Sequence, residues 1–387
     1  ATKNYYMREL LSPASNTVDI FDRNTGKKKK MYMFGSNNYL GLANDNSLLQ
    51  KIQSKIVKYG IGLGGPPLLN GYTSIHKELE KKVSSIKNKE DALLFSSGYC
   101  ANLGLISGLL NKKDLIIYDE YSHASLIDGI KLSGALGVPF RHNDMTELKR
   151  LIINLKDNHK NTFIAFEGLY SMDGDTCRLD KIIGLAKKYG TYTILDDSHA
   201  TGVLGKSGKG ACEKFNLIDS VDFIMGSFSK AFSLTGGFVC GSKAAIDYLR
   251  VFSRQYMFST SMPPILVASI LSAIEVQESS PQLLSRLKRN TRLVIEQLRS
   301  MVEFAATPEV GIVVIRIPEK GNVIKLNEEF HSRNIFINSV SYPAVPINEQ
   351  RFRISLMSTH TEDDINYLVD SIKDVWKKYH LSKLKGN

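Results

Sequence analysis

The chain has 387 residues, of which 43% are hydrophobic and 23% charged, as expected of a soluble globular protein with two or three domains. It has no run of about 18 apolar residues, which excludes a hydrophobic membrane-spanning helix. The sequence does not begin with the apolar segment of a signal peptide, which predicts a cytoplasmic protein. The four cysteines lack Cys-x-x-Cys spacing, which argues against a zinc site and a disulfide framework, so we expect no metal.

The formal net charge of +11 is compatible with attraction of nucleic acid, an anionic membrane or an anionic substrate. The lysines are spread along the whole chain, with one run at residues 27–30, and no DNA- or RNA-binding motif accompanies them. That run follows Asn24, Thr25 and Gly26, a turn signal, so we expect it to begin the second strand of a surface hairpin. We interpret the charge mainly as solvated surface, with no nucleic-acid partner and at most peripheral membrane contact.

Residues 1–45 are predicted to form an N-terminal arm with a short helical start followed by this hairpin. Over residues 46–275, apolar runs alternate with amphipathic segments, which is typical of an α/β domain with a largely parallel sheet. Residues 276–387 are predicted to form a smaller α+β domain. Predicted strands are 92–95, 115–118, 162–166, 192–195, 221–225, 238–240, 312–317 and 353–356. Predicted helices include 74–86, 101–110, 146–155, 179–189, 282–301 and 362–379.

Lys230 lies in a loop between two predicted buried strands, among hydroxyl and glycine residues. Burial favours the neutral amine, which can form a Schiff base with an aldehyde. Upstream, the strand at 192–195 ends in Asp196, Asp197 and His199, at the edge of a parallel sheet where ligands bind. A carboxylate there can keep a pyridine nitrogen protonated, and the imidazole can contact another edge of the ring. Each side chain alone has an ordinary structural explanation, but together they favour pyridoxal phosphate as the cofactor.

A series of motifs runs in order along the sequence: FGSNNYLGL (34–42), LNGYTSIHKELE (69–80), LFSSGYCANLG (94–104), DEYSHASLIDGIKLS (119–133), HND (142–144), FEGLYSMDGD (166–175), DDSHATGVLG (196–205), MGSFSKAFSLTGGFVCG (225–241), FSTSMPP (258–264), PAVP (343–346) and RFRISLMSTHT (351–361). In these motifs the chain resembles the α-oxoamine synthases, which are pyridoxal-phosphate enzymes of the aspartate-aminotransferase fold, fold type I. The resemblance implies a large domain with a mostly parallel seven-stranded sheet and a smaller C-terminal α+β domain.

The resemblance also implies roles for individual residues. Lys230 corresponds to the lysine that holds the cofactor, Asp196 to the acid at the ring nitrogen, and His199 to the group at the phenolic oxygen. His123 corresponds to the histidine that stacks on the ring and can also contact the substrate. Further residues implied in cofactor binding are Ser171 near the ring, and Gly98, Tyr99, Ser227, Ser259 and Thr260 at the phosphate.

In the family, the segment matching Ser259 and Thr260 reaches the cofactor of the neighbouring subunit, which implies a homodimer with shared active sites. The guanidinium of Arg353 is the candidate for binding the amino-acid carboxylate, with Arg351 as the alternative on the same face of the strand. Asn38 resembles an active-site residue of the arm. Relatives commonly carry Ser-Arg where this chain has Pro66 and Pro67, which removes a cation.

The activity that the resemblance implies is a decarboxylative Claisen condensation of an amino acid with an acyl thioester of coenzyme A or a carrier protein, giving an α-amino ketone. Lys230 would take the α-proton of the amino acid, and His123 and His199 would polarise the thioester. Within the family the motifs most resemble bacterial serine palmitoyltransferases, which predicts L-serine, a long-chain acyl thioester and a role in sphingolipid biosynthesis. The alternatives are 8-amino-7-oxononanoate synthase (alanine and pimeloyl thioester), a relative using cysteate, a plain aminotransferase, or a non-enzymatic partner built on this fold.

Overall fold

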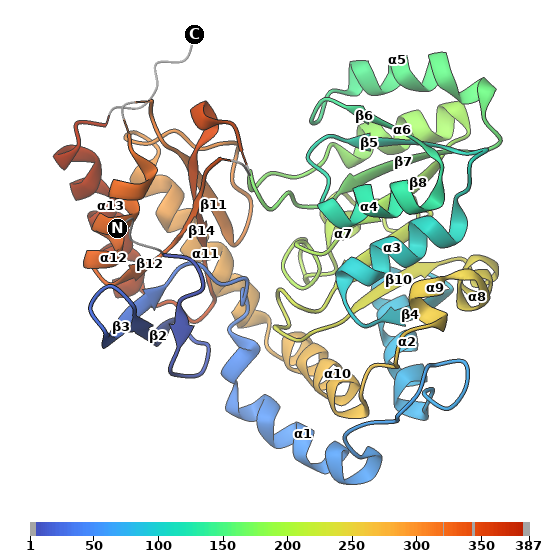
Figure 1. The fold of residues 1–387 in the computed structure, drawn as a ribbon, viewed down its shortest axis with the longest axis horizontal. Helices are drawn as coiled ribbons and strands as arrows, with labels where there is room; N and C mark the ends of the chain where they lie inside the picture. The colour runs from blue at the N-terminus through green and yellow to red at the C-terminus, as the bar shows by residue number, and fades with distance from the viewer. Residues whose placement is uncertain (1–4, 320, 343–344, 382–387) are drawn as a thin grey trace. The chain divides into compact units, whose positions relative to one another are not determined.

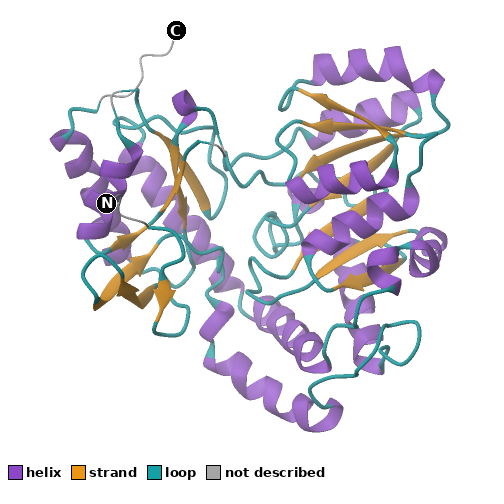
Figure 2. Ribbon diagram, in the orientation of Figure 1, coloured by secondary structure: helices purple, strands orange, loops and turns teal. Residues whose placement is uncertain are grey.

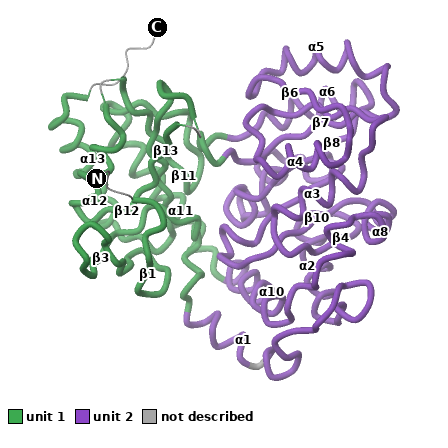
Figure 3. Tube along the Cα trace, in the orientation of Figure 1, with its two compact units in different colours: residues 1–45, 171–175, 280–387 green, residues 46–170, 176–279 purple. Residues whose placement is uncertain are grey.

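The structure is a computed structural model that describes residues 5–319, 321–342 and 345–381, so Pro343 and Ala344 of the PAVP motif lie outside the described residues (Figure 1). The chain divides into two units (Figure 3). Unit 1 comprises Ala1–Asp45, Ser171–Asp175 and Ser280–Asn387, and unit 2 comprises Asn46–Tyr170 and Thr176–Ser279. Within the described parts of the chain, no helix combines the length and the apolar character needed to cross a membrane.

Unit 2 is built on a seven-stranded sheet in the order β4-β10-β9-β8-β7-β5-β6 (Figure 2). Its strands are β4 (Asp91–Phe95), β5 (Leu115–Asp119), β6 (Leu136–Phe140), β7 (Thr162–Glu167), β8 (Tyr192–Asp196), β9 (Phe223–Ser227) and β10 (Gly237–Gly241). Only β10 among them runs antiparallel to its neighbours, so the other six strands point the same way. This confirms the mostly parallel seven-stranded sheet predicted from the sequence. Consequently β4, β5, β7, β8 and β9 all end at one edge.

Helices alternate with these strands and cover the sheet (Figure 2). They are α1 (Asn46–Tyr59), α2 (Ser74–Lys87), α3 (Gly98–Leu109), α4 (Ala124–Ser133), α5 (Met145–Leu155), α6 (Leu179–Tyr189), α7 (Ala211–Lys214), α8 (Lys243–Phe252), α9 (Arg254–Met257) and α10 (Pro264–Ser279). A core cluster joins the sheet to α3 and α4, with Phe95, Leu105, Ile116 and Leu126 all at most 2% exposed. Burying each such side chain stabilises the fold by about 1.5–3 kcal/mol.

Unit 1 contains two smaller sheets. One has the order β1-β2-β3-β12, from β1 (Glu9–Leu10), β2 (Thr17–Asp22), β3 (Lys27–Met33) and β12 (Ile335–Phe336). The other has the order β11-β14-β13, from β11 (Ile312–Arg316), β14 (Arg351–Ser355) and β13 (Asn338–Val340). The helices are α11 (Pro281–Leu298), α12 (Val323–Ser332) and α13 (Glu362–Lys378), the last with a capping box between Thr361 and Asp364.

The hairpin predicted around the lysine run is present, because β2 and β3 pair antiparallel with Asp22 opposite Lys27. Gly26 closes the turn at φ +67°, in the left-handed region that glycine adopts most readily. The short helical start predicted before the hairpin is wrong for the described residues from 5 onward. Glu9 and Leu10 instead form β1 and pair with β2, which satisfies their backbone groups without a helix.

His360 gives unit 1 a predicted pH dependence. It is 3% exposed, its Nδ1 accepts from the Met357 amide at 3.0 Å, and its Nε2 lies 3.0 Å from the Met33 carbonyl. Burial lowers the pKa of His360 from 6.5 to about 4, so the folded state resists protonation that the unfolded chain accepts. The contribution of His360 to the free energy of unfolding is therefore fully present above about pH 6.5, and it falls by roughly 3 kcal/mol as the pH drops to about 4.

Urea unfolding of wild type and His360→Gln at several pH values checks this. The free-energy difference between the two proteins should shrink as the pH falls below about 6.5, because only the wild type loses the histidine contribution. A difference that is constant between neutral pH and about pH 5 would contradict it.

Candidate active site

A cavity of about 230 Å³ lies in unit 2, where five of the parallel strands end. Its lining consists of Ser97, Gly98, Tyr99, Asn102, His123, Ser125, Glu167, Asp196, Ser198, His199, Ser227, Ser229 and Lys230. Seven residues predicted from the sequence are therefore brought together: Gly98, Tyr99, His123, Asp196, His199, Ser227 and Lys230. They come from segments far apart in the chain, and the common direction of the strands collects them at one edge.

Asp196 is the last residue of β8 and is 5% exposed. Its Oδ2 accepts a hydrogen bond from Asn102 Nδ2 at 2.7 Å, and its Oδ1 accepts one from the Ser198 amide at 3.0 Å. Asn102 lies on α3 and is 1% exposed, so the carboxylate is held by a buried amide from a neighbouring element. An ionised carboxylate with fixed donors is suited to pairing with a protonated ring nitrogen.

The ring of His123 is oriented through a chain of hydrogen bonds that begins at the same amide. Asn102 Nδ2 also donates to Ser125 Oγ at 2.9 Å, and Ser125 Oγ lies 2.8 Å from His123 Nδ1. His123 caps the N-terminus of α4, and the Ser125 amide donates to Nδ1 at 3.3 Å. Because Nδ1 accepts from a backbone N–H, a neutral ring carries its proton on Nε2. The Tyr99 ring stands edge-on to His123, with centroids 6.3 Å apart.

The N-terminus of α3 provides the anion-binding part of the cavity. Ser97 caps the helix by accepting from the Cys100 amide at 3.1 Å, and the amides of Gly98 and Tyr99 precede the first intrahelical hydrogen bonds. Opposite them, Ser227 Oγ lies 2.7 Å from Ser229 Oγ. A Cβ on Gly98 would come within 2.8 Å of the Ser227 Cβ, so only glycine leaves this space open.

Lys230 follows β9 in a loop whose backbone is tied to the sheet. The Phe228 amide donates to the Gly236 carbonyl at 3.0 Å, and the Ser233 amide donates to the Lys230 carbonyl at 3.1 Å. The lysine side chain is half-buried at the cavity wall. The loop places Lys230 in the wall of the same cavity as Asp196, His123 and His199, where its amine could capture an aldehyde.

Behind the cavity, the loop that follows Asp196 is anchored by an ion pair that the sequence analysis missed. Lys87, the last residue of α2, donates to Asp197 Oδ2 at 2.6 Å, to Thr201 Oγ1 at 2.8 Å and to the Lys209 carbonyl at 2.7 Å. Both charged side chains are 2% exposed. A Cβ on Gly210 would come within 1.8 Å of Asp197 Oδ2, so the carboxylate fills the space beside that glycine.

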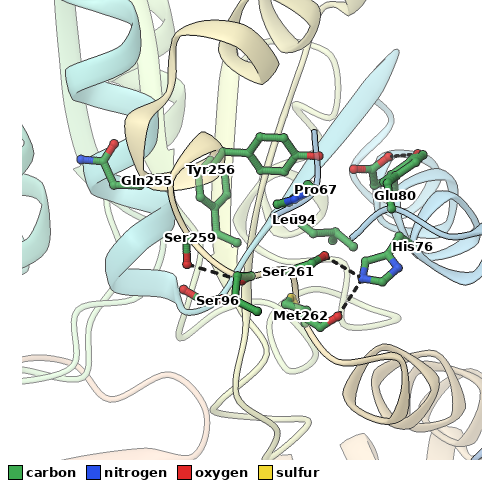
Figure 4. A pocket seen from close by; sticks show the side chains of 13 residues that line it. Pro67, His76, Glu80, Leu94, Ser96, Gln255, Tyr256, Ser259, Ser261 and Met262 are labelled. Carbon is green, nitrogen blue, oxygen red and sulfur yellow. Dashed lines mark hydrogen bonds between the residues drawn. The ribbon is translucent and has the colours of Figure 1, made fainter. Parts of the chain in front are cut away.

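The remaining predicted residues lie outside this cavity. Ser171, Asn38 and Arg353 belong to unit 1, where Arg353 Nε donates to the Ser171 carbonyl at 2.6 Å. Ser259 and Thr260 line a second, smaller cavity of about 20 Å³ in unit 2 (Figure 4). In this smaller cavity His76 Nε2 lies 2.8 Å from the Met262 carbonyl, and Pro67, one of the two unusual prolines, is also part of the wall. About one water molecule fits in such a space.

The two arginines of β14 differ in their surroundings. Arg351 forms ion pairs with Asp173 at 2.7 Å and Glu349 at 2.8 Å. Arg353 is 6% exposed, and its hydrogen-bond partners are neutral oxygens of Ser171, Ser355, Asn37 and Tyr39 at 2.6–3.2 Å. The charge of Arg351 is thus balanced within unit 1. Arg353 is oriented by the neutral oxygens of these four residues.

The sequence analysis did not single out Asn102, Ser125 or Glu167, which the structure places in the cavity wall. All three lie within motifs that carried the resemblance, LFSSGYCANLG, DEYSHASLIDGIKLS and FEGLYSMDGD. Their types gave no chemical signal, because an asparagine or serine in a helix and a glutamate ending a strand are common in any fold.

Comparison with known proteins agrees with this geometry. A model of the class I and II aminotransferase family matches residues 29–372. A serine palmitoyltransferase of Sphingobacterium spiritivorum is 40% identical over 357 residues, covering 92% of this chain and 89% of the relative. An 8-amino-7-oxononanoate synthase of Thermoanaerobacter pseudethanolicus is 36% identical over 353 residues, covering 91% and 89%. A solved structure of serine palmitoyltransferase with pyridoxal phosphate superposes with a TM-score of 0.91 at 28% identity, covering 98% and 94%.

The chain therefore belongs to the class I and II aminotransferase family, and within that family to the α-oxoamine synthases. It is a pyridoxal-phosphate-dependent acyltransferase, as the resemblance implied. The cavity fits the cofactor by its chemistry, since it offers an amine for the aldehyde, a buried carboxylate for the ring nitrogen and helix N-terminal amides for the phosphate.

Proposed function

We propose that the enzyme condenses L-serine with a long-chain acyl thioester, releasing carbon dioxide and the thiol and forming an α-amino ketone. A solved serine palmitoyltransferase superposes with a TM-score of 0.91 and a solved 8-amino-7-oxononanoate synthase with 0.78, which supports serine and a long acyl chain over alanine and a pimeloyl thioester. The observation that supports binding of an amino-acid carboxylate is the environment of Arg353. This guanidinium is buried, and its hydrogen-bond partners among the described residues are neutral oxygens. The positive net charge of the chain favours an anionic thioester carrier, either coenzyme A or an acidic carrier protein.

In this proposal the cofactor, once bound, supplies a protonated ring that stabilises negative charge on the amino-acid α-carbon. Lys230 would hold the cofactor covalently and would accept the α-proton of the amino acid. Asp196 keeps the ring nitrogen protonated, and His199 hydrogen-bonds the ring. His123 supports the ring face and offers Nε2–H to the thioester oxygen as charge develops there. Gly98, Tyr99 and Ser227 bind the phosphate.

We further propose a homodimer in which Ser259 and Thr260 extend to the cofactor phosphate of the other copy, with Ser171 as a further cofactor-binding residue and Asn38 as a substrate-binding residue. Mixing Lys230→Ala subunits with subunits that carry substitutions at both Ser259 and Thr260 tests this. Shared sites predict partial recovery of activity in the mixture, because one site of each mixed dimer contains no altered residue. No recovery in a mixture shown to contain mixed dimers would contradict the sharing.

Replacing Arg353 with Lys should lower kcat/KM for the amino acid by about 10- to 100-fold, because a hydrogen bond to a charged group contributes about 1.5–3 kcal/mol. The loss should appear as a higher KM for the amino acid, while KM for the thioester stays unchanged. Arg316→Lys, a change on neighbouring β11 where the arginine pairs with Glu303, is the matched control and should behave as wild type.

Substrate identity is tested by offering the purified enzyme a panel of amino acids with acyl thioesters of different length and measuring thiol release. We expect the highest kcat/KM with L-serine and a long-chain thioester. Highest activity with alanine and pimeloyl thioester would replace the proposal by an oxononanoate synthase. Turnover of keto acids without any thioester requirement would contradict both.

A further inference from the structure

Buried carboxyl groups stand at the ends of three adjacent strands of the sheet. Asp119 ends β5, Glu167 ends β7 and Asp196 ends β8, and the ladder places Glu167 directly opposite Asp196. They are 1%, 6% and 5% exposed. Negative charges on these neighbouring strand ends would repel one another in a buried site, so the arrangement favours retention of a proton by one of the three groups.

The three carboxyl groups differ in the number of hydrogen-bond donors that would stabilise the ionised form. Asp119 accepts from the amides of Tyr121 and Asn143 at 2.9 and 3.1 Å and lies 3.0 Å from His142 Nδ1. Asp196 accepts from the Asn102 side chain and the Ser198 amide.

Glu167 accepts one hydrogen bond among the described residues, from the His123 amide to Oε1 at 2.6 Å. Its strand lies between the two that carry the other carboxyl groups, and it has the fewest hydrogen-bond donors of the three, so ionisation is least favourable there. Burial, together with the charges of Asp196 and Asp119, raises the pKa of Glu167 well above its ordinary value, against smaller opposing effects of the hydrogen bond from the His123 amide and of Lys230. Two further titratable residues contact Glu167: the amide of His123 donates to Oε1, and the hydroxyl oxygen of Tyr170 accepts from the Glu167 amide at 3.3 Å.

We propose that Glu167 is a neutral carboxylic acid in the resting enzyme and donates a hydrogen bond from Oε2 to an anionic oxygen of the molecule bound in the cavity. Oε1 is occupied by the His123 amide, and Glu167 is part of the cavity wall, which leaves Oε2 as the donor. A neutral donor here avoids placing a second negative charge beside Asp196 in a site that takes up an anionic cofactor and an amino-acid carboxylate. It also keeps His123 in place through Oε1. This inference rests on the cavity being the cofactor site but not on the identity of the substrates.

Infrared difference spectroscopy tests the protonation directly, without activity. The spectrum of wild type minus Glu167→Gln at neutral pH should show the C=O band of a protonated carboxylic acid, which shifts in D₂O, in the cofactor-free and the cofactor-loaded protein. If this difference spectrum showed only the bands of an ionised carboxylate, Glu167 would be charged and the proposal would be overturned. Asp114→Asn is the matched control, since this buried carboxylate on the residue before β5 accepts from Asn111 and Asn161 at 2.7–3.0 Å and should lose only carboxylate bands.

Binding of pyridoxal phosphate tests the donor role. Glu167→Gln keeps an acceptor for the His123 amide and a donor toward the cavity, so its dissociation constant should stay within about threefold of wild type. Glu167→Met removes both groups and should weaken binding by about 3- to 10-fold, the usual effect of one net hydrogen bond. Equal weakening in both variants would show that the negative charge, not a donated hydrogen bond, acts there and would overturn the donor assignment. If the enzyme proved to use an amino acid other than serine, the results of these two measurements would not change.

Discussion

Lys230→Ala should abolish the covalent attachment of pyridoxal phosphate and lower kcat by at least about a thousandfold. The same amine is proposed to hold the cofactor and to accept the α-proton, and general-base catalysis alone contributes about 10²- to 10⁴-fold. The visible absorbance of the bound cofactor should change from that of a lysine Schiff base to that of the free aldehyde. Spectroscopy of the variant incubated with the cofactor, together with thiol release in the full assay, measures both effects.

Lys206→Ala, an exposed lysine in the loop after His199, is the matched control and should keep both the absorbance and the activity of wild type. Retention of the Schiff-base absorbance by Lys230→Ala would place the covalent bond on another lysine. Wild-type turnover in the same variant would remove Lys230 from the mechanism.

Lys87→Met should destabilise the protein by about 3–5 kcal/mol, because it leaves the buried carboxylate of Asp197 without its partner. The methionine fits the space of the lysine stem, so the loss comes mainly from the uncompensated charge and from the hydrogen bonds to Thr201 and Lys209. Since the anchored loop carries His199 and follows Asp196 directly, affinity for the cofactor should fall as well. Urea unfolding and cofactor titration of the purified variant measure the two effects.

Lys82→Met is the control on the same helix. Lys82 pairs with Glu278 at 2.6 Å, but the two side chains are 33% and 44% exposed, so this pair should contribute less than about 1 kcal/mol. Similar stability losses in the two variants would show that the burial of the Lys87 pair has no special effect.

The strand pattern could be predicted because buried parallel strands are short apolar runs bounded by polar turns. Six strands of the large sheet were found this way, whereas β6 was missed because its sequence, LGVPF, contains Gly137 and Pro139. A proline is tolerated there because β6 is an edge strand with one open side. Helix α3 begins at Gly98, three residues before the predicted start, since Ser97 is the cap.

The site could be predicted where the residue type itself carries chemistry, as in Lys230, Asp196 and His199. The supporting residues could not, because their importance arises from contacts across the fold. Lys87 and Asp197 are 110 positions apart in the sequence, and the pairing of Asn102 with Asp196 spans 94. Helical and strand periodicity relate only residues that are close in the sequence, so neither contact could be inferred from it. Likewise, the proton assigned to Glu167 follows from the adjacency of β7 and β8, not from its local sequence.

The most direct measurement is peptide mapping by mass spectrometry after the cofactor-loaded enzyme has been reduced with borohydride, which fixes the covalent bond. We predict that the added mass of the reduced cofactor is found on one peptide and that fragmentation assigns it to Lys230. Its presence on a different lysine, or its absence from a fully loaded enzyme, would contradict the assignment of this cavity as the active site.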